Sequence, residues 1–373
     1  MKKSILLFSL SMVLAGGIVS SCKKETEGPD PAIGGTTDLN RTALLTEWAD
    51  NLVKPGYQAF GGKLTLLKTQ TAAFAAAPTV ARLQSARQAW REAYLEWQKV
   101  EMFEFGPAAD VSLVNHFNIY PTDAAGIRQN IASGTYNFEL SAAIPQQGFP
   151  ALDYLLNGIG ADDAAIVQSY VASANQRRYL TDVVGKMDQL FAGVQGQWNG
   201  AYRATFIGST GTNAGSSLSL AVNAFSRYYE HFLRSGKIGI PAGVMTGTAA
   251  PEKIEAYYYR RELPLELAVA AHAAAQNAFN GRAGQPSIKT YVDALGAKDS
   301  RTGQSLAQLI NAQFGIAAQQ LATLGPDLYI TIQTRNATAT QAFAEMQKAV
   351  RLLKVDMTSA MSVTVTYVDN DGD

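Results

Sequence analysis

Cysteine is almost absent from this sequence, and histidine is scarce. The 373 residues contain one cysteine, Cys22, and three histidines, His116, His231 and His272. A single thiol near the N-terminus excludes an intrachain disulfide, a thiolate zinc cluster and a buried catalytic cysteine. The histidines are far apart, and none belongs to an H-E-x-x-H or other short-spaced zinc pattern.

The sequence also lacks any imbalance of charge. Its 31 basic and 31 acidic residues give a formal net charge of zero, so we expect no nucleic-acid partner. With 32 Gly, 13 Pro and 47% apolar residues, the composition excludes a disordered chain, a collagen and a coiled-coil rod. There is no Walker A loop, no Gly-x-Ser-x-Gly elbow and no Rossmann fingerprint. We therefore expect one or two globular domains.

No apolar run is long enough for an ordinary membrane-spanning helix. The longest candidate, residues 5–19, has about 15 residues where roughly 20 are needed. Two lysines precede the run, and small residues lead from it into Cys22, as in a bacterial lipobox. We expect residues 1–21 to be a secretory signal peptide and Cys22 to be lipidated, which would attach the protein to a membrane. An ordinary signal peptide with an incidental thiol is the alternative.

Residues 22–39 contain too few large apolar residues to form a core, so we expect a flexible tether there. The folded body should begin near Asn40. Its longest stretch without large apolar residues, 208–217, divides it into an N-terminal part, 40–207, and a C-terminal part, 208–373. We expect a helical bundle on each side of this loop.

Apolar residues recur at helical spacing through most of the body. Residues 79–103 contain neither Gly nor Pro and have apolar residues three and four apart, which predicts one helix of about 38 Å. The same spacing predicts helices over 216–234 and 342–353. Alternation typical of a strand is clearest over 362–367, which we interpret as a short tail. The sequence therefore predicts an all-α fold.

Two charged residues fall on the apolar stripe of the predicted long helix. Arg87 and Glu101 continue the register that Trp90 and Tyr94 set. They are 14 residues apart, about 21 Å along a helix, so each needs a partner from another element. One interpretation is a pair of structural ion pairs or side chains that snorkel at the edge of the stripe. The other is that they line a polar pocket between helices.

The segment 148–156, Gly-Phe-Pro-Ala-Leu-Asp-Tyr-Leu-Leu, has the pattern of a helix start. Pro150 suits the first turn, and Asp153 lies near the positive end of the helix dipole. The segment is also similar to the Gly-x-His-x-x-Glu helix of the imelysin-like family, insulin-cleaving and iron-regulated lipoproteins of Gram-negative bacteria. Further segments that resemble this family are 87–107, 120–123, 178–180, 222–241 and 367–373.

The resemblance implies two helical bundles packed together, with a cleft at their junction. We expect this cleft to be lined by Gly148, Pro150 and Asp153, with Arg87, Glu101, Asp123, Arg227, Glu230 and Lys237 around them. We expect them to bind a ligand, and we predict no catalytic residue. For Arg227 and Glu230, the alternative is a ladder of solvated surface pairs with Arg234.

The chemistry of the family motif carries over only in part. Pro150 stands where the family has His, and proline has no side-chain atom that can bind a metal. Asp153 replaces the family's Glu with a shorter carboxylate. Among the histidines, His116 is the best candidate for the cleft because it precedes Asp123 closely. A site of His116 and Asp153 with further carboxylates would suit iron or another divalent cation better than zinc.

Two other patterns are weaker. Residues 257–261, Tyr-Tyr-Tyr-Arg-Arg, combine aromatic and basic side chains, but consecutive residues of a helix point in different directions, so no shared stacking platform is predicted. The tail 369–373 resembles the start of a calcium loop. It lacks the carboxylate at position 12 and a following helix, so it does not predict an EF-hand.

These observations favour a non-enzymatic, imelysin-like lipoprotein of the cell envelope. We expect it to be lipid-anchored to the outer membrane, on its periplasmic or surface face, and to bind a ligand or metal. The family resemblance associates it with iron or haem uptake and with an envelope partner in that process. One alternative is a metal-dependent peptidase with ligands shifted to Asp153, Glu101, Asp123 and His116. Another is an envelope scaffold that binds a protein across the cleft.

Overall fold

The computed structural model describes residues 40–260, 262–300 and 302–368. The predicted signal peptide, the tether with Cys22, and the tail 369–373 lie outside the described residues. Within the described ranges, no helix combines the length and the apolar composition needed to span a membrane.

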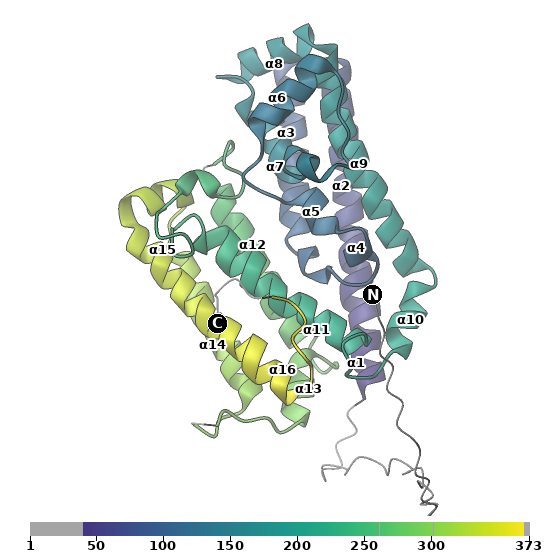
Figure 1. The fold of residues 1–373 in the computed structure, drawn as a ribbon, viewed down its shortest axis with the longest axis vertical. Helices are drawn as coiled ribbons and strands as arrows, with labels where there is room; N and C mark the ends of the chain where they lie inside the picture. Colours follow the sequence, from purple (N-terminus) through teal and green to yellow (C-terminus); the bar gives the residue numbers. More distant parts are fainter. Residues whose placement is uncertain (1–39, 261, 301, 369–373) are drawn as a thin grey trace, which may run out of the picture. The chain divides into compact units, whose positions relative to one another are not determined.

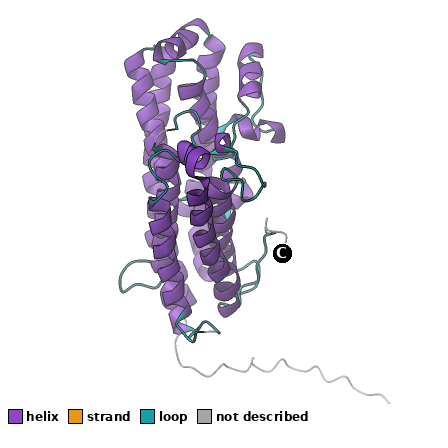
Figure 2. Ribbon diagram, turned by 90° about the vertical axis from the view of Figure 1, so that its left-hand side faces the viewer, coloured by secondary structure: helices purple, strands orange, loops and turns teal. Residues whose placement is uncertain are grey.

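Helices dominate the structure, as Figures 1 and 2 show, and the prediction of an all-α fold is confirmed. The part of the chain that the structure describes contains no β-strand, and residues 362–367 form neither a strand nor a helix. The α-helices of the N-terminal part are α1 (Arg41–Trp48), α2 (Lys54–Ala76), α3 (Val80–Trp97), α4 (Pro107–Asp110), α5 (Leu113–Phe117), α6 (Ala124–Ser133), α7 (Gly148–Asp153), α8 (Asp163–Ala172), α9 (Ala174–Asn199) and α10 (Tyr202–Gly208). Those that follow are α11 (Ser217–Arg227), α12 (Leu263–Asn280), α13 (Ile288–Ala294), α14 (Leu306–Ala322), α15 (Leu328–Arg351) and α16 (Thr358–Ala360).

Short 3-10 and π-helical segments extend or connect these helices. The π-helical segments are η1 (Ala49–Val53), η4 (Tyr154–Gly158), η5 (Tyr228–Gly239) and η7 (Leu352–Met357), and the 3-10 segments are η2 (Glu101–Phe103), η3 (Ser141–Gln146) and η6 (Pro251–Lys253). Helix α1 runs through η1 into α2, and α11 runs through η5. The second of these therefore continues beyond Arg234, where the sequence predicts its end.

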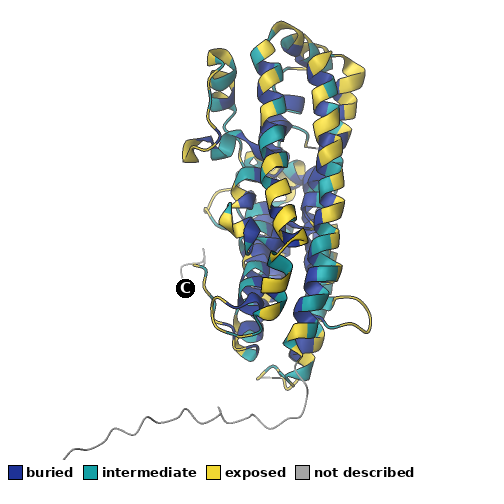
Figure 3. Ribbon diagram, turned by 90° about the vertical axis from the view of Figure 1, so that its right-hand side faces the viewer, coloured by how far each residue is buried: buried dark blue, intermediate teal, exposed yellow. Residues whose placement is uncertain are grey.

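Helix α2 packs against both α3 and α9, and these three long helices lie side by side in Figure 1. Tyr57, Phe60, Leu64, Leu67 and Phe74 of α2 are fully buried at helical spacing. Figure 3 shows the result, with exposed residues along the outer side of the long helices and buried residues along the inner side. In the C-terminal part, α14 packs against α12 and α15, and η5 packs against α12 and α15.

The predicted helix over 79–103 is too long at its C-terminal end. Helix α3 ends at Trp97, where the N–H groups of Lys99 and Val100 bond to carbonyls only three residues back. This tighter turn leads into η2, which begins at Glu101. Glu101 is therefore not on the α3 stripe, although its side chain is buried.

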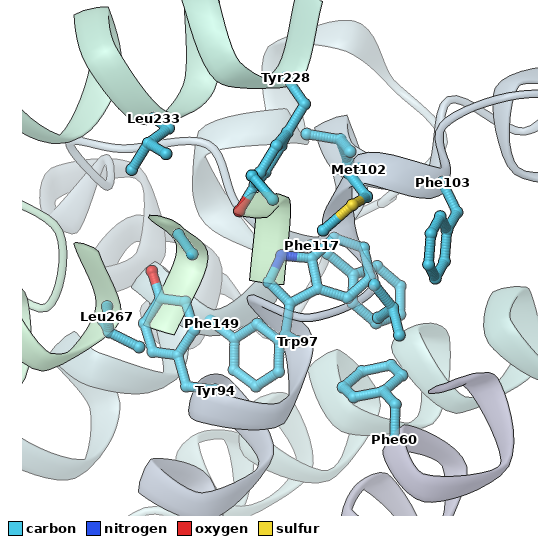
Figure 4. Close-up of a cluster of buried hydrophobic side chains, with 14 of the residues drawn as sticks. Phe60, Tyr94, Trp97, Met102, Phe103, Phe117, Phe149, Tyr228, Leu233 and Leu267 are labelled. Carbon is cyan, nitrogen blue, oxygen red and sulfur yellow. The ribbon is translucent and has the colours of Figure 1, made fainter. Parts of the chain in front are cut away.

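An aromatic cluster connects the motif helix to the core (Figure 4). The Phe149 ring of α7 stacks on Tyr94 with centroids 4.4 Å apart, and the Trp97 ring stacks on Phe117 at 4.8 Å. Tyr228 of η5 lies in the same cluster, and its hydroxyl donates to the carbonyl of Gln98 at 3.1 Å. Residues from both sides of the loop at 209–216 thus share one buried region.

Candidate functional site

Glycine and proline determine how the motif helix α7 begins. Gly148 has a φ of 76°, a conformation that favours glycine. A Cβ on Gly148 would lie 2.4 Å from the carbonyl oxygen of Phe117. Pro150 follows in the first turn, where a helix does not need its missing N–H. The start of α7 is therefore held against the end of α5 by a backbone contact that only glycine permits.

Asp153 joins α7 to a segment far along the chain. Its Oδ2 accepts a hydrogen bond from the N–H of Tyr258 at 2.7 Å, and its Oδ1 accepts one from the N–H of Tyr259 at 2.9 Å. The side chain of Asn157 donates to Oδ1 at 3.1 Å. Burial raises the pKa of Asp153 to about 7, although these three donors and the charge of Arg87 lower it. Asp153 thus holds the turn at Tyr258 and Tyr259 against the motif helix.

A pocket of about 280 Å³ lies beside this contact. Pro150 and Asp153, three residues apart on α7, both line it. The pocket is slightly smaller than the usual range of roughly 300–1,000 Å³ for drug-sized ligands, so it suits a small molecule or a part of a larger one. Its lining residues are Tyr120, Pro121, Thr122, Pro150, Asp153, Glu252, Ile254, Ala256, Tyr257 and Tyr258.

A buried polar cluster lies next to the pocket, since Glu255 comes between two of the lining residues. The Nζ of Lys237 donates to both carboxylate oxygens of Glu255 at 2.8 Å and is 3.6 Å from Oε2 of Glu101. The Nδ2 of Asn118 donates to Oε1 of Glu101 and to Oε1 of Glu255, each at 2.7 Å. The hydroxyl of Tyr94 donates to Oδ1 of Asn118 at 2.5 Å. One ammonium group therefore lies beside two buried carboxyl groups.

Burial and neighbouring charges shift the pKa values of the groups in and beside this cluster. Burial raises the pKa of Glu101, Lys237 lowers it, and the neighbouring Glu255 raises it. Burial also raises the pKa of Tyr120, and the charges of Glu255 and Glu101 add to this effect. Tyr120 therefore both lines the pocket and interacts electrostatically with the two carboxyl groups of the cluster.

Arg87 and Asp123 have partners that account for their positions. Arg87 donates to the carbonyl of Leu156 at 2.9 Å and to Oδ1 of Asp163 at 2.6 Å. This is the structural ion pair that the sequence left open as one alternative. Asp123 is the N-cap of α6, and the N–H of Gly126 and then the side chain of Gln146 lower its pKa. Neither Arg87 nor Asp123 is among the residues that line the pocket.

The charged residues of α11 and η5 separate into different environments. Arg227 is exposed, with its guanidinium 5.4 Å from the centre of the Phe232 ring. Glu230 is fully buried, and Lys354 and Tyr367 each donate to its carboxylate at 3.0 Å. Lys237, by contrast, belongs to the cluster beside the pocket. The structure therefore brings Lys237 and Glu101 together in the cluster, brings Pro150 and Asp153 together in the pocket wall, and places Arg227 and Glu230 elsewhere.

The side chains of the predicted metal site have other partners. Nδ1 of His116 lies 3.1 Å from Oε1 of Gln147, whereas Asp153 is bound by backbone N–H groups. Across the described ranges, no three His, Cys, Asp or Glu side chains converge in a way that could hold a metal ion. Pro150 offers no ligand atom at the motif's His position. The residues present therefore do not fit the metal pair that the family motif implies.

Three parts of the site were not predicted from the sequence. Glu255 and Asn118 meet although 137 positions separate them, and no sequence signal links them. The tyrosine run was interpreted as helical, but residues 257–259 form a turn, and both Tyr257 and Tyr258 line the pocket. The run of three tyrosines was the available sequence signal, because aromatic side chains are common in the walls of ligand pockets.

We expect the free energy of unfolding to decrease between pH 5 and pH 8, with Asp153 responsible for about 2.5 kcal/mol of the decrease. The carboxyl ionises near 3.9 in an unfolded chain and near 7 in the fold. The stabilisation is thus complete below the lower pKa and is lost as the pH rises through the higher one. Denaturant unfolding at each pH measures it.

The variant Asp153→Asn isolates this contribution, because the other buried carboxyls titrate in both proteins. An amide does not ionise, so the variant should show a shallower dependence of stability on pH. It should also be less stable at pH 5, since an amide offers one acceptor atom where two backbone N–H groups need one each. Equal pH dependence in the two proteins would contradict the prediction.

Comparison with known proteins identifies a family. Residues 53–357 match a family model whose description is Imelysin. Iron-regulated protein A of Synechococcus elongatus is 32% identical over 125 residues, which are 34% of this chain and 34% of that protein. The match thus spans about a third of the length of this curated relative.

Two solved structures share the fold. One is a protein from Parabacteroides distasonis named as an iron-regulated protein A precursor, with a TM-score of 0.70. The other is an imelysin-like protein from Psychrobacter arcticum, with a TM-score of 0.67. Each is 19% identical, and each alignment covers 88% of this chain and 97% of the other. The resemblance seen in the sequence is confirmed, and because the family model covers most of its length, this chain belongs to the imelysin family.

Proposed function

We propose that this chain is a lipid-anchored envelope protein that binds a small ligand in the pocket beside α7 and does not cleave peptides. The observation that carries the proposal is Pro150 at the motif's His position, in the pocket wall. The other half of the motif, Asp153, already accepts three hydrogen bonds. A carboxylate has about four acceptor sites, so little capacity remains for a metal ion.

The sequence and the relatives support the cellular setting of this proposal. The apolar run and the small residues before Cys22 support a lipoprotein signal, and the resemblance to lipoproteins of Gram-negative bacteria supports an anchor in the outer membrane. The name iron-regulated protein A, carried by a relative in sequence and by one in fold, supports a role in iron or haem uptake. An envelope partner in that process would receive or deliver the ligand.

The test compares the full-length protein, purified in detergent, with Pro150→His and Pro150→Ala. Metal analysis and thermal unfolding with Fe²⁺, Fe³⁺, Zn²⁺, Ca²⁺ and haem would be combined with peptidase assays with and without chelator. We expect no stoichiometric metal and no chelator-sensitive cleavage for the wild type and for Pro150→Ala. Pro150→His returns the missing ligand atom, but Asp153 keeps its three hydrogen bonds, so we expect at most a weak gain of affinity for a divalent ion. Saturation at 100 times Kd would add about 2.7 kcal/mol of stability.

A stoichiometric metal in the wild type, together with chelator-sensitive cleavage, would establish the metal-dependent peptidase instead. The association with iron has a separate measurement, the abundance of the protein in cells grown with and without iron. An unchanged abundance would contradict that part of the proposal.

A further inference from the structure

The acidic side chains among the described residues that line the pocket are Asp153 and Glu252, and Asp153, with its pKa raised to about 7 by burial, is negatively charged mainly above that pH. Asp153 lines it from α7 and is buried, and Glu252 of η6 lines it and is exposed. None of the ten lining residues is Lys, Arg or His. Among these described residues, a ligand with a negative charge would meet carboxyl groups and no cationic side chain, whereas a positive charge would be attracted.

Tyrosine rings supply the second feature of the pocket. Tyr257 and Tyr258 both line it, with ring centroids 5.1 Å apart and ring planes at 73° to each other. The guanidinium of Arg260 already lies over the Tyr257 ring, so Tyr258 is the ring of this pair that a ligand would contact. Together with Tyr120, the pair makes three of the ten lining residues aromatic. Aromatic side chains around an acidic pocket are the surroundings in which methylated ammonium groups bind.

Two arginines of the chain already lie over tyrosine rings in this region. The guanidinium of Arg260 lies 5.4 Å from the centre of the Tyr257 ring and 4.7 Å from that of Tyr329. The guanidinium of Arg128 lies 5.9 Å from the Tyr154 ring and donates to its hydroxyl at 3.0 Å. Both arginines are engaged with these rings, and neither lines the pocket.

We propose that the ligand of this pocket is a small organic cation whose charge is carried by a methylated ammonium group. The inference rests on the proposed function, because it takes the pocket beside α7 as the binding site. The three hydrogen bonds to Asp153 leave about one acceptor site on the buried carboxylate, so most of the three acceptors that a primary ammonium needs would have to come from the exposed Glu252 or from hydroxyl groups of the pocket wall. A methylated ammonium needs none, and it interacts with ring faces and with the nearby negative charge.

The test uses two ligands of equal shape and different charge. Choline and its uncharged carbon isostere 3,3-dimethyl-1-butanol would be titrated into the full-length protein, in a non-ionic detergent without choline groups. Glycerophosphocholine, which carries the choline, phosphate and glycerol of a lipid headgroup, is the third ligand. Comparing it with choline shows whether the pocket binds a free cation or a headgroup. Binding would be followed by calorimetry and by thermal unfolding. We expect choline to bind and to raise the melting temperature, and the isostere to do neither.

Two variants test the two features separately. Tyr258→Leu removes a ring face and should weaken choline binding roughly 3- to 30-fold. Glu252→Gln removes an exposed charge without changing shape and should weaken binding about 2- to 5-fold. Asp110→Asn, an exposed carboxylate that does not line the pocket, is the matched control and should bind as the wild type does. Because Glu252 is exposed, its variant remains informative if Tyr258→Leu fails to fold.

The outcomes separate this inference from the proposed function. Equal binding of choline and its isostere, or unchanged choline binding by Glu252→Gln and Tyr258→Leu, would overturn the organic cation and leave a ligand pocket in place. Absence of choline binding would overturn it as well. Chelator-sensitive peptide cleavage by the wild type would overturn the proposed function, whichever ligand binds.

Discussion

Replacing Lys237 by methionine is expected to lower the free energy of unfolding by about 3–5 kcal/mol. The ammonium group is bound to both oxygens of Glu255 and is the cation nearest to Glu101, and all three side chains are at most 2% exposed. Methionine fills a similar volume but leaves two buried carboxyl groups without a positive charge. Equilibrium unfolding in denaturant measures the loss.

Two comparisons identify the cause of this loss. Lys68→Met removes a lysine whose side chain is 54% exposed and paired with Asp188, so it should change stability by no more than about 1 kcal/mol. The double variant Lys237→Met with Glu255→Gln removes both charges and should be more stable than the sum of the two single losses predicts. Strict additivity would show that Lys237 acts through packing and not through charge.

Gly148→Ala is expected to destabilise the fold by about 3 kcal/mol or more. A positive φ costs an alanine about 1–2 kcal/mol, and the new Cβ would lie 2.4 Å from the carbonyl oxygen of Phe117. Backbone atoms cannot rotate away as a side chain does, so α5 and α7 must separate. Since α7 carries Pro150 and Asp153, the same change should weaken ligand binding. Thermal and denaturant unfolding provide the measurement.

Two other glycines distinguish the stability lost through the positive φ from the stability lost through the Cβ contact. Gly247 has a φ of 75° and no atom within 4 Å of an added Cβ, so Gly247→Ala should cost only the conformational part. Gly193 is an exposed residue of α9 with equally open surroundings, and Gly193→Ala should stabilise the helix by about 0.5–1 kcal/mol. The prediction fails if Gly148→Ala and Gly247→Ala lose equal stability.

Much of the helical architecture was readable from local patterns. The apolar spacing that predicted a helix from residue 79 places Trp90, Tyr94 and Trp97 in the core of α3. The pattern at 148–156 predicted a helix start with Pro150 in its first turn, as α7 has it. Such features depend on residues within one or two turns of each other, so they can be inferred without knowing the tertiary contacts.

The composition of the site depended on contacts over long distances. The sequence predicted that Glu101 needs a partner from another element, but not that Lys237 and Asn118 would supply it or that Glu255 would share them. The sequence also predicted that the helix continues past Trp97, because apolar spacing does not indicate where an α-helix gives way to a tighter turn.

By itself, the sequence determined that this protein is all-α, that it belongs to a recognisable family, and that Pro150 removes the ligand atom of the family motif. Only the tertiary structure decided which charges face each other and which tyrosines surround the pocket. The physical reason is that a buried charge pairs with whichever opposite charge the fold brings close to it, and this can come from any distance along the sequence. The turn at 257–259 provides the example, since two of its tyrosines reach the pocket because Asp153, more than a hundred residues earlier, binds its backbone.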